Sequence, residues 1–127
     1  MTRPKQTGPT EREMEILRSL WQNGPSTVRQ VNEAMNARQK TGYTTTLKLM
    51  QIMMNKGLLI RDDSQFKHLF EAAVSEESTQ NQVVGNMLDR VFGGSTEKLV
   101  MRALSAKKVS KKDLARIREL IERMEEK

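Results

Sequence analysis

The hydrophobic pattern of this chain changes its period at Gly57, and this change constrains the fold more than any other feature. Before Gly57 the apolar residues recur at helical spacing, whereas 58–61 (LLIR) and 66–70 (FKHLF) are short β-compatible runs separated by the polar turn 62–65. Two isolated strands are only marginally stable, so the hairpin must pack against helices. Three helices followed by a hairpin predict a winged helix.

Local start and stop signals predict three helices ahead of the hairpin. Thr10 and Glu13 match a capping box, and the first helix behind it is expected to bury Met14, Leu17, Leu20 and Trp21. The triplet 23–25 (NGP) ends it, and Ser26 is expected to cap a second helix at 27–37, which buries Val28, Val31, Ala34 and Met35. A third helix runs from 43 to 56 and ends at Gly57.

The chain after residue 74 is predicted to be helical again. A helix starting at Ser75 or Glu76 ends at 93–95 (GGS), a second covers 96–105, and Ser110 caps a third. We therefore expect a mostly α chain with a disordered arm at 1–9, a winged helix-turn-helix DNA-binding domain at 10–73, and a three-helix dimerisation domain at 74–127.

Composition removes several classes of protein. The 127 residues include no cysteine, which excludes disulfide scaffolds, zinc fingers and cysteine nucleophiles. His68 is the single histidine, and with no partner histidine or cysteine we assign it no chemistry and expect an ordinary strand residue. We predict no enzymatic activity, no metal and no cofactor. No apolar run could span a bilayer and the start of the chain is polar, so we expect a cytoplasmic protein without a membrane partner.

Charge and helix geometry suggest DNA as the partner. The formal net charge is +6, and the positive excess lies mainly before residue 74. On the third helix, Tyr43, Thr46, Leu49, Met50 and Met53 share a face that we assign to the core, and the opposite face is polar. The candidate DNA-binding residues are Tyr43, Thr44, Thr45, Lys48, Gln51, Asn55 and Lys56 with Arg61 and Lys67 of the wing, where Asp62 and Asp63 would oppose phosphate.

The C-terminal helices carry apolar stripes suited to packing against another copy. A segment of about 54 residues rarely forms a core large enough to make it stable alone, so we expect it to associate with another copy. The candidate dimerisation residues are Val84, Leu88, Val91, Leu99, Leu114, Ile117, Ile121 and Met124.

An ordered set of short motifs resembles one known family. The set is Thr10-x-x-Glu13, Leu20-Trp21, 24–28 (GPSTV), 43–45 (YTT), 56–58 (KGL) and 93–95 (GGS). With these motifs in this order, residues 10–124 resemble the penicillinase-repressor family of bacterial winged-helix transcription factors. The resemblance implies a homodimeric repressor on a palindromic operator. It also places the family's recognition-helix contacts on Thr44, Thr45, Leu47, Lys48, Gln51 and Ile52, of which Leu47 and Ile52 depart from the usual polar or basic residues.

The resemblance also bears on how such a repressor is released. In the antibiotic-resistance members, release follows cleavage between an Asn and a Phe and is linked to an upstream membrane sensor protease. The matching positions here are Arg102-Ala103, so we do not predict that signal. The copper-responsive relatives carry a C-terminal cysteine cluster that this chain lacks.

Two functions of different classes follow. The first is a sequence-specific repressor that binds a double-stranded palindromic operator as a homodimer. The alternative is a winged-helix protein-interaction adaptor without sequence-specific DNA binding. Salt distinguishes them, because DNA binding weakens steeply with ionic strength and an apolar protein interface responds little.

Overall fold

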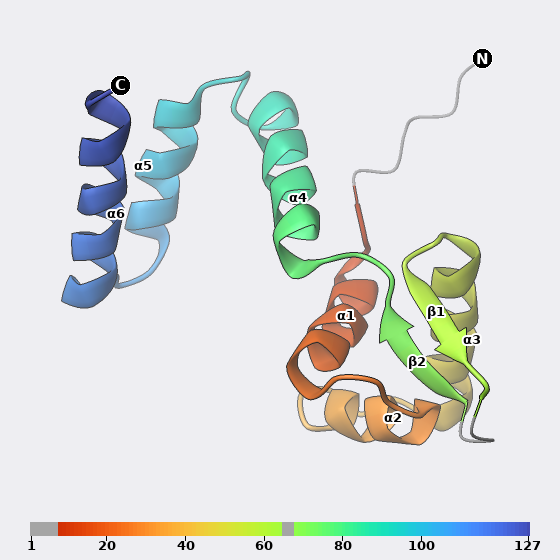
Figure 1. Ribbon diagram of the computed structural model, residues 1–127. Helices are drawn as coiled ribbons and strands as arrows, with labels where there is room; N and C mark the ends of the chain where they lie inside the picture. The colour runs from red at the N-terminus through yellow and green to blue at the C-terminus, as the bar shows by residue number, and fades with distance from the viewer. Residues whose placement is uncertain (1–7, 65–67) are drawn as a thin grey trace, which may run out of the picture. The chain divides into compact units, whose positions relative to one another are not determined.

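The computed structural model describes residues 8–64 and 68–127, and the elements follow the predicted order (Figure 1). Contacts between residues divide the chain into two compact units, Met1–Gly85 and Asn86–Lys127, which we describe separately. The elements are α1 (Glu11–Asn23), α2 (Val28–Asn36), α3 (Tyr43–Asn55), β1 (Leu59–Asp62), β2 (Leu69–Ala72), α4 (Glu76–Arg90), α5 (Thr96–Ala106) and α6 (Lys111–Glu125). The first unit holds the elements through β2 and the start of α4, and a functional boundary at 73/74 stays a prediction.

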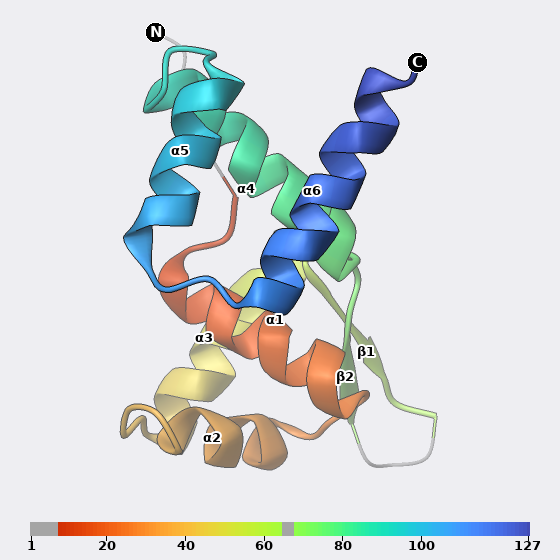
Figure 2. The ribbon, with the colours of Figure 1, turned by 90° about the vertical axis from the view of Figure 1, so that its left-hand side faces the viewer.

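The first unit is a winged helix, as predicted. Helices α1, α2 and α3 contact one another. The hairpin lies against α1 through β2 (Figure 2) and against α3 through β1 (Figure 1). The two strands are antiparallel, with Leu59 opposite Ala72 and Asp62 opposite Leu69. The core between these elements consists of Ile16, Leu17, Leu20, Val28, Val31, Met35, Met50, Met53, Leu59 and Phe70.

Several predicted helix ends are confirmed. The Thr10 hydroxyl accepts a hydrogen bond from the Glu13 amide and the Glu13 carboxylate accepts one from the Thr10 amide, which completes a capping box. Gly57 follows α3 with a φ of 80°, a conformation that favours glycine. Ser110 caps α6 through the amide of Asp113. These interactions are local, which is why the sequence reveals them.

The predicted cap of α2 is wrong by one residue. Thr27, not Ser26, is the N-cap, and it forms a capping box with Gln30. Ser26 is extended and pairs with the second strand: its amide donates to the Phe70 carbonyl at 3.0 Å, and the Phe70 amide donates back at 2.8 Å. This pair attaches the hairpin to the loop between α1 and α2.

The second strand begins later than predicted. Residues 66 and 67, the start of the predicted run, and residue 65 of the predicted turn lie outside the described residues. His68, expected within the strand, precedes β2 and has a φ of 46°. Leu58, expected in the first strand, belongs to the turn after α3, where its amide donates to the Met53 carbonyl at 2.9 Å. Pairing therefore begins at Leu59 in β1 and at Leu69 in β2, in a register that places Leu59 opposite Ala72 and Ser26 opposite Phe70.

Some residues expected in the core are only partly buried. Leu17 and Leu20 of α1 are buried, but Met14 and Trp21 lie at the edge of the core. Ala34 of α2 is only partly buried. The indole nitrogen of Trp21 donates to the Val74 carbonyl at 3.0 Å. Trp21 lies at the edge of the core because its polar nitrogen requires such a partner.

Candidate nucleic-acid interface

Helix α3 is buried on one face and exposed on the other. Thr46, Met50 and Met53 are fully buried against the core. Five candidate DNA-binding residues, Thr44, Thr45, Lys48, Gln51 and Asn55, are exposed. Tyr43–Asn55 contains no acidic residue, so the exposed face offers hydrogen-bonding groups and one positive charge. Such a face suits the acceptor-rich edges of bases and the phosphates beside them.

Three other residues of α3 lie at the margins of this face. Tyr43, which we expected on the core side, is 50% exposed; it is the first residue of the helix, and the first buried residue of α3 is Thr46. That placement agrees with its other predicted role as a DNA-binding residue. Leu47 is partly buried against the core, whereas Ile52 is 40% exposed.

The start of α3 is held by a side chain from α2. The amide nitrogen of Asn32 donates to the Thr41 carbonyl and to the Thr46 hydroxyl, both at 2.8 Å. The Thr46 hydroxyl in turn lies 3.8 Å from the Met35 sulfur. Asn32 thus connects α2, the turn and the first turns of α3, and it orients the helix that carries the polar face.

The turn between α2 and α3 is fixed from two further directions. Thr41 is buried; its amide donates to the Asn36 side chain at 2.6 Å, and its hydroxyl accepts from the Arg12 guanidinium at 2.7 Å. Arg12 also donates to the Gln39 side chain at 2.8 Å. Sequence reasoning assigned no role to Arg12, Asn32 or Asn36.

The end of α3 is held by an ion pair. Lys56 Nζ lies 2.8 Å from Glu13 Oε2 and 3.1 Å from Oε1, and Glu13 is only 2% exposed. Burial raises the pKa of Glu13, but hydrogen bonds from Lys56 and Thr10 and the charge of Lys56 lower it further than burial raises it, so the net pKa is lowered. Lys56, predicted to contact DNA, therefore has a partner within the chain.

The described part of the wing carries more negative than positive charge, because Arg61 is outnumbered by Asp62 and Asp63. Arg61 Nε lies 2.9 Å from Asp63 Oδ1, and His68 Nδ1 lies 2.7 Å from the same oxygen. The hydrogen bond from His68 and the charge of Arg61 lower the pKa of Asp63, and hydrogen bonds from Ser64 lower that of Asp62, so both carboxylates are ionised at neutral pH. Arg61 is thus engaged by Asp63, and Lys67 lies outside the described residues.

The candidate dimerisation residues are mostly uncovered. Val84, Val91, Leu114, Ile121 and Met124 are exposed, and Leu88, Leu99 and Ile117 are partly buried. Within Asn86–Lys127 no side chain is buried, since every residue there is exposed or intermediate. The second unit thus has apolar surface without a core of its own.

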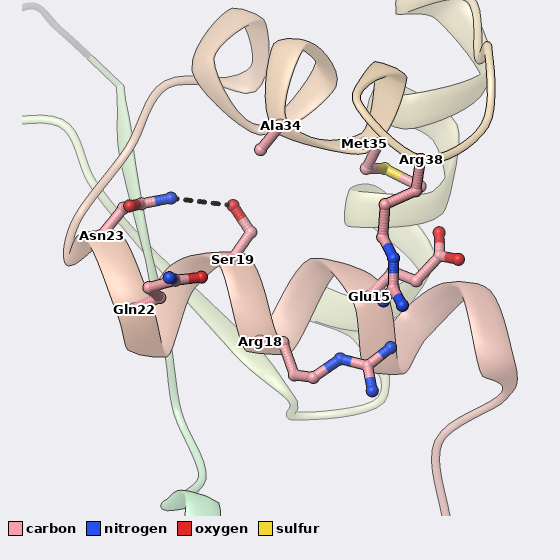
Figure 3. Close-up of a pocket in the computed structure, with 8 residues that line it drawn as sticks. All are labelled: Glu15, Arg18, Ser19, Gln22, Asn23, Ala34, Met35 and Arg38. Carbon is pink, nitrogen blue, oxygen red and sulfur yellow. Dashed lines mark hydrogen bonds between the residues drawn. The ribbon is translucent and has the colours of Figure 1, made fainter.

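A cavity of about 290 Å³ lies between α1 and α2 (Figure 3). Arg38 reaches from the end of α2 toward α1, where Glu15 and Arg18 lie, and the Asn23 amide donates to the Ser19 hydroxyl. Glu15 Oε2 is buried without a hydrogen-bond partner among the described residues. The lining carries charges of both signs, from Glu15, Arg18 and Arg38.

Other site types find no support within residues 8–64 and 68–127. These residues contain no group of three His, Cys, Asp or Glu side chains that could hold a metal ion. No helix in the same part of the chain is long and apolar enough to cross a membrane.

Comparison with known proteins tests the family suggested by the motifs. The sequence profile described as penicillinase repressor matches residues 9–123. This chain belongs to the penicillinase repressor family. The resemblance noted from the sequence is thereby confirmed. The family and its relatives are named as regulators and not as enzymes, in agreement with the prediction that the chain is not an enzyme.

Two curated relatives are transcriptional regulators, and one solved structure shares the fold. Two proteins named "Transcriptional regulator BlaI", from Mycobacterium tuberculosis strains CDC 1551 / Oshkosh and ATCC 25618 / H37Rv, are each 39% identical over 59 residues. The aligned segment spans 44% of this chain and 43% of each relative. A MarR family protein from Bacillus stearothermophilus shares the fold, with a TM-score of 0.52 and 15% identity over 93% of this chain and 74% of that chain.

Proposed function

We propose that this member of the penicillinase repressor family is a transcriptional repressor that binds a palindromic operator as a homodimer. The observation that carries the proposal is the exposed, acid-free polar face of α3 on a helix held at both ends, by Asn32 at its start and by Lys56 at its end. In a helix-turn-helix, the second helix enters the major groove and its exposed side chains contact base edges.

The proposed contact surface is drawn from residues that are free to reach DNA. Tyr43, Thr44, Thr45, Lys48, Gln51 and Asn55 form it. We leave out Lys56, which pairs with the buried Glu13, and give Arg61 a minor role, because Asp63 neutralises it. Phosphate contacts from α3 would then depend chiefly on Lys48.

Dimerisation through the C-terminal helices is the second part of the proposal. The second unit exposes Leu114, Ile121 and Met124 along α6 and buries no side chain, which supports association with another copy. A two-fold dimer would read two half-sites about 10 bp apart, or a multiple of that distance. Repression would follow from occlusion of the promoter, and the site of action would be the bacterial cytoplasm.

Selection of duplexes from a random DNA pool tests the whole proposal. The purified chain is expected to enrich a palindrome, and a salt titration of the best duplex should show affinity falling steeply with ionic strength. A duplex with one half-site scrambled is the control and should bind much more weakly. Absence of enrichment would contradict the proposal and would favour the protein-interaction adaptor.

A further inference from the structure

Ile52 is the one aliphatic side chain of α3 that the described residues leave exposed. It is 40% exposed, whereas Met50 and Met53 are buried, and Leu47, Leu49 and Met54 pack partly against the core. An isolated apolar side chain at a surface needs no explanation by itself. The neighbours of Ile52 on the helix, however, point to a function for this side chain.

Ile52 lies among side chains suited to DNA. Lys48 precedes it by four residues and Asn55 follows it by three, so both share its face, and both are exposed. The helix has no acidic residue, so its charge complements phosphate. An apolar protein partner would not require this surrounding set of hydrogen-bonding groups.

The major groove offers one apolar group at the base edges, the C5-methyl group of thymine. We propose that Ile52 packs against a thymine methyl in each half-site and thereby determines specificity at that position. The inference rests on the proposed DNA binding and adds to it the base that is read, thymine, and the group that Ile52 contacts, the C5-methyl group. It also gives a role to a residue that departs from the family's usual polar or basic choice.

Replacement of thymine by uracil tests this contact, because uracil lacks the methyl group and keeps the hydrogen-bonding groups. In the best selected duplex, each thymine of the half-sites is replaced in turn. Substitution at one symmetric position should weaken binding about four-fold per half-site, the effect of losing one buried methyl group. The Ile52→Ala variant should bind the thymine and uracil duplexes equally well.

Ile60→Ala is the matched control, since Ile60 is an isoleucine 52% exposed on β1 of the same unit. This variant should keep the full penalty for uracil. Equal binding of thymine and uracil duplexes by the unmodified chain would overturn the proposal, as would an Ile52→Ala variant that keeps the penalty. Failure of the DNA-binding proposal itself is distinguishable, because the unmodified chain would then select no duplex.

Discussion

At the scale of single residues, Lys48 carries the positive charge of the α3 surface. It is exposed, and it forms no ion pair with any residue that the structure describes. Lys56 and Arg61 differ, because each has a carboxylate partner within 3 Å. The contribution of each cation to DNA binding therefore depends on the partners it already has, not on its presence in the sequence.

Lys48→Ala is expected to weaken DNA binding on specific and non-specific duplexes by a similar factor. If Lys48 contacts phosphate, the slope of log affinity against log salt should become shallower by about one unit, because one fewer counterion is released. Salt titrations of both proteins measure this. Lys112→Ala on α6 is the control and should leave the slope unchanged, while an unchanged slope for Lys48→Ala would remove it from the phosphate contacts.

Glu13→Gln tests the ion pair with Lys56. The glutamine can still accept from the Thr10 amide but lacks the charge, so the free energy of unfolding at neutral pH should fall by about 1–3 kcal/mol. The pKa of Glu13 is lowered from its ordinary value of 4.5, so its stabilising effect is complete above that pH and is lost as the pH falls through the lower folded value.

Denaturant unfolding of both proteins, at neutral pH and at about pH 3, measures this dependence. The difference between Glu13→Gln and the unmodified chain should shrink at the lower pH. Glu11→Gln, in the exposed first position of α1, is the control and should change stability little. A difference that is the same at both pH values would show that the charge of Glu13 does not stabilise the fold.

At the scale of elements, the turn between α2 and α3 determines how the polar face is presented. Arg12 from α1 and Asn36 from α2 both bind Thr41, and Asn32 joins the turn to α3. None of these three side chains belongs to the proposed contact surface. Their effect on DNA binding would therefore come through the orientation of α3.

Arg12→Ala removes the hydrogen bonds to Gln39 and Thr41 and is expected to lower the free energy of unfolding by about 1–3 kcal/mol. The ratio of specific to non-specific affinity should fall several-fold, because base contacts require the orientation of α3. The salt slope should not change, since no phosphate contact is lost. Arg18→Ala on the same helix is the control; an equal loss for Arg18→Ala would point to a general effect of charge.

At the scale of the whole molecule, the two units differ in how much they bury. The first unit has a continuous core of ten buried apolar residues, while the second has amphipathic helices without a buried side chain. A unit of this size that buries so little gains its stability most readily from another copy. Dimerisation and folding of the second unit would then be coupled.

Ile121→Asp places a charge on the apolar stripe of α6 and is expected to produce a monomer. Sedimentation at micromolar concentration should show a dimer for the unmodified chain and a monomer for the variant, with weaker operator binding because only one half-site is engaged at a time. Ala115→Asp, on the opposite side of α6, is the control and should remain a dimer. A monomer for the unmodified chain would contradict the proposal.

Features that depend on neighbours in the chain could be predicted from the sequence alone. The capping box at Thr10, the helix end at Gly57 and the cap at Ser110 each involve groups within about four residues, and the change of period at Gly57 revealed the hairpin. Together they determined the fold class. They also determined which side of α3 is polar, because that follows from helical spacing.

Only the tertiary structure decided which polar residues remain available for DNA binding and which already have a partner within the chain. Lys56 meets Glu13 across 43 residues of sequence, and Arg12 meets Thr41 across 29, so neither pairing follows from local spacing. The same holds for Ser26, where pairing with Phe70 moved the cap of α2 to Thr27. Residue type and period determine what a side chain can do, but the long-range packing of the core determines which partner it has.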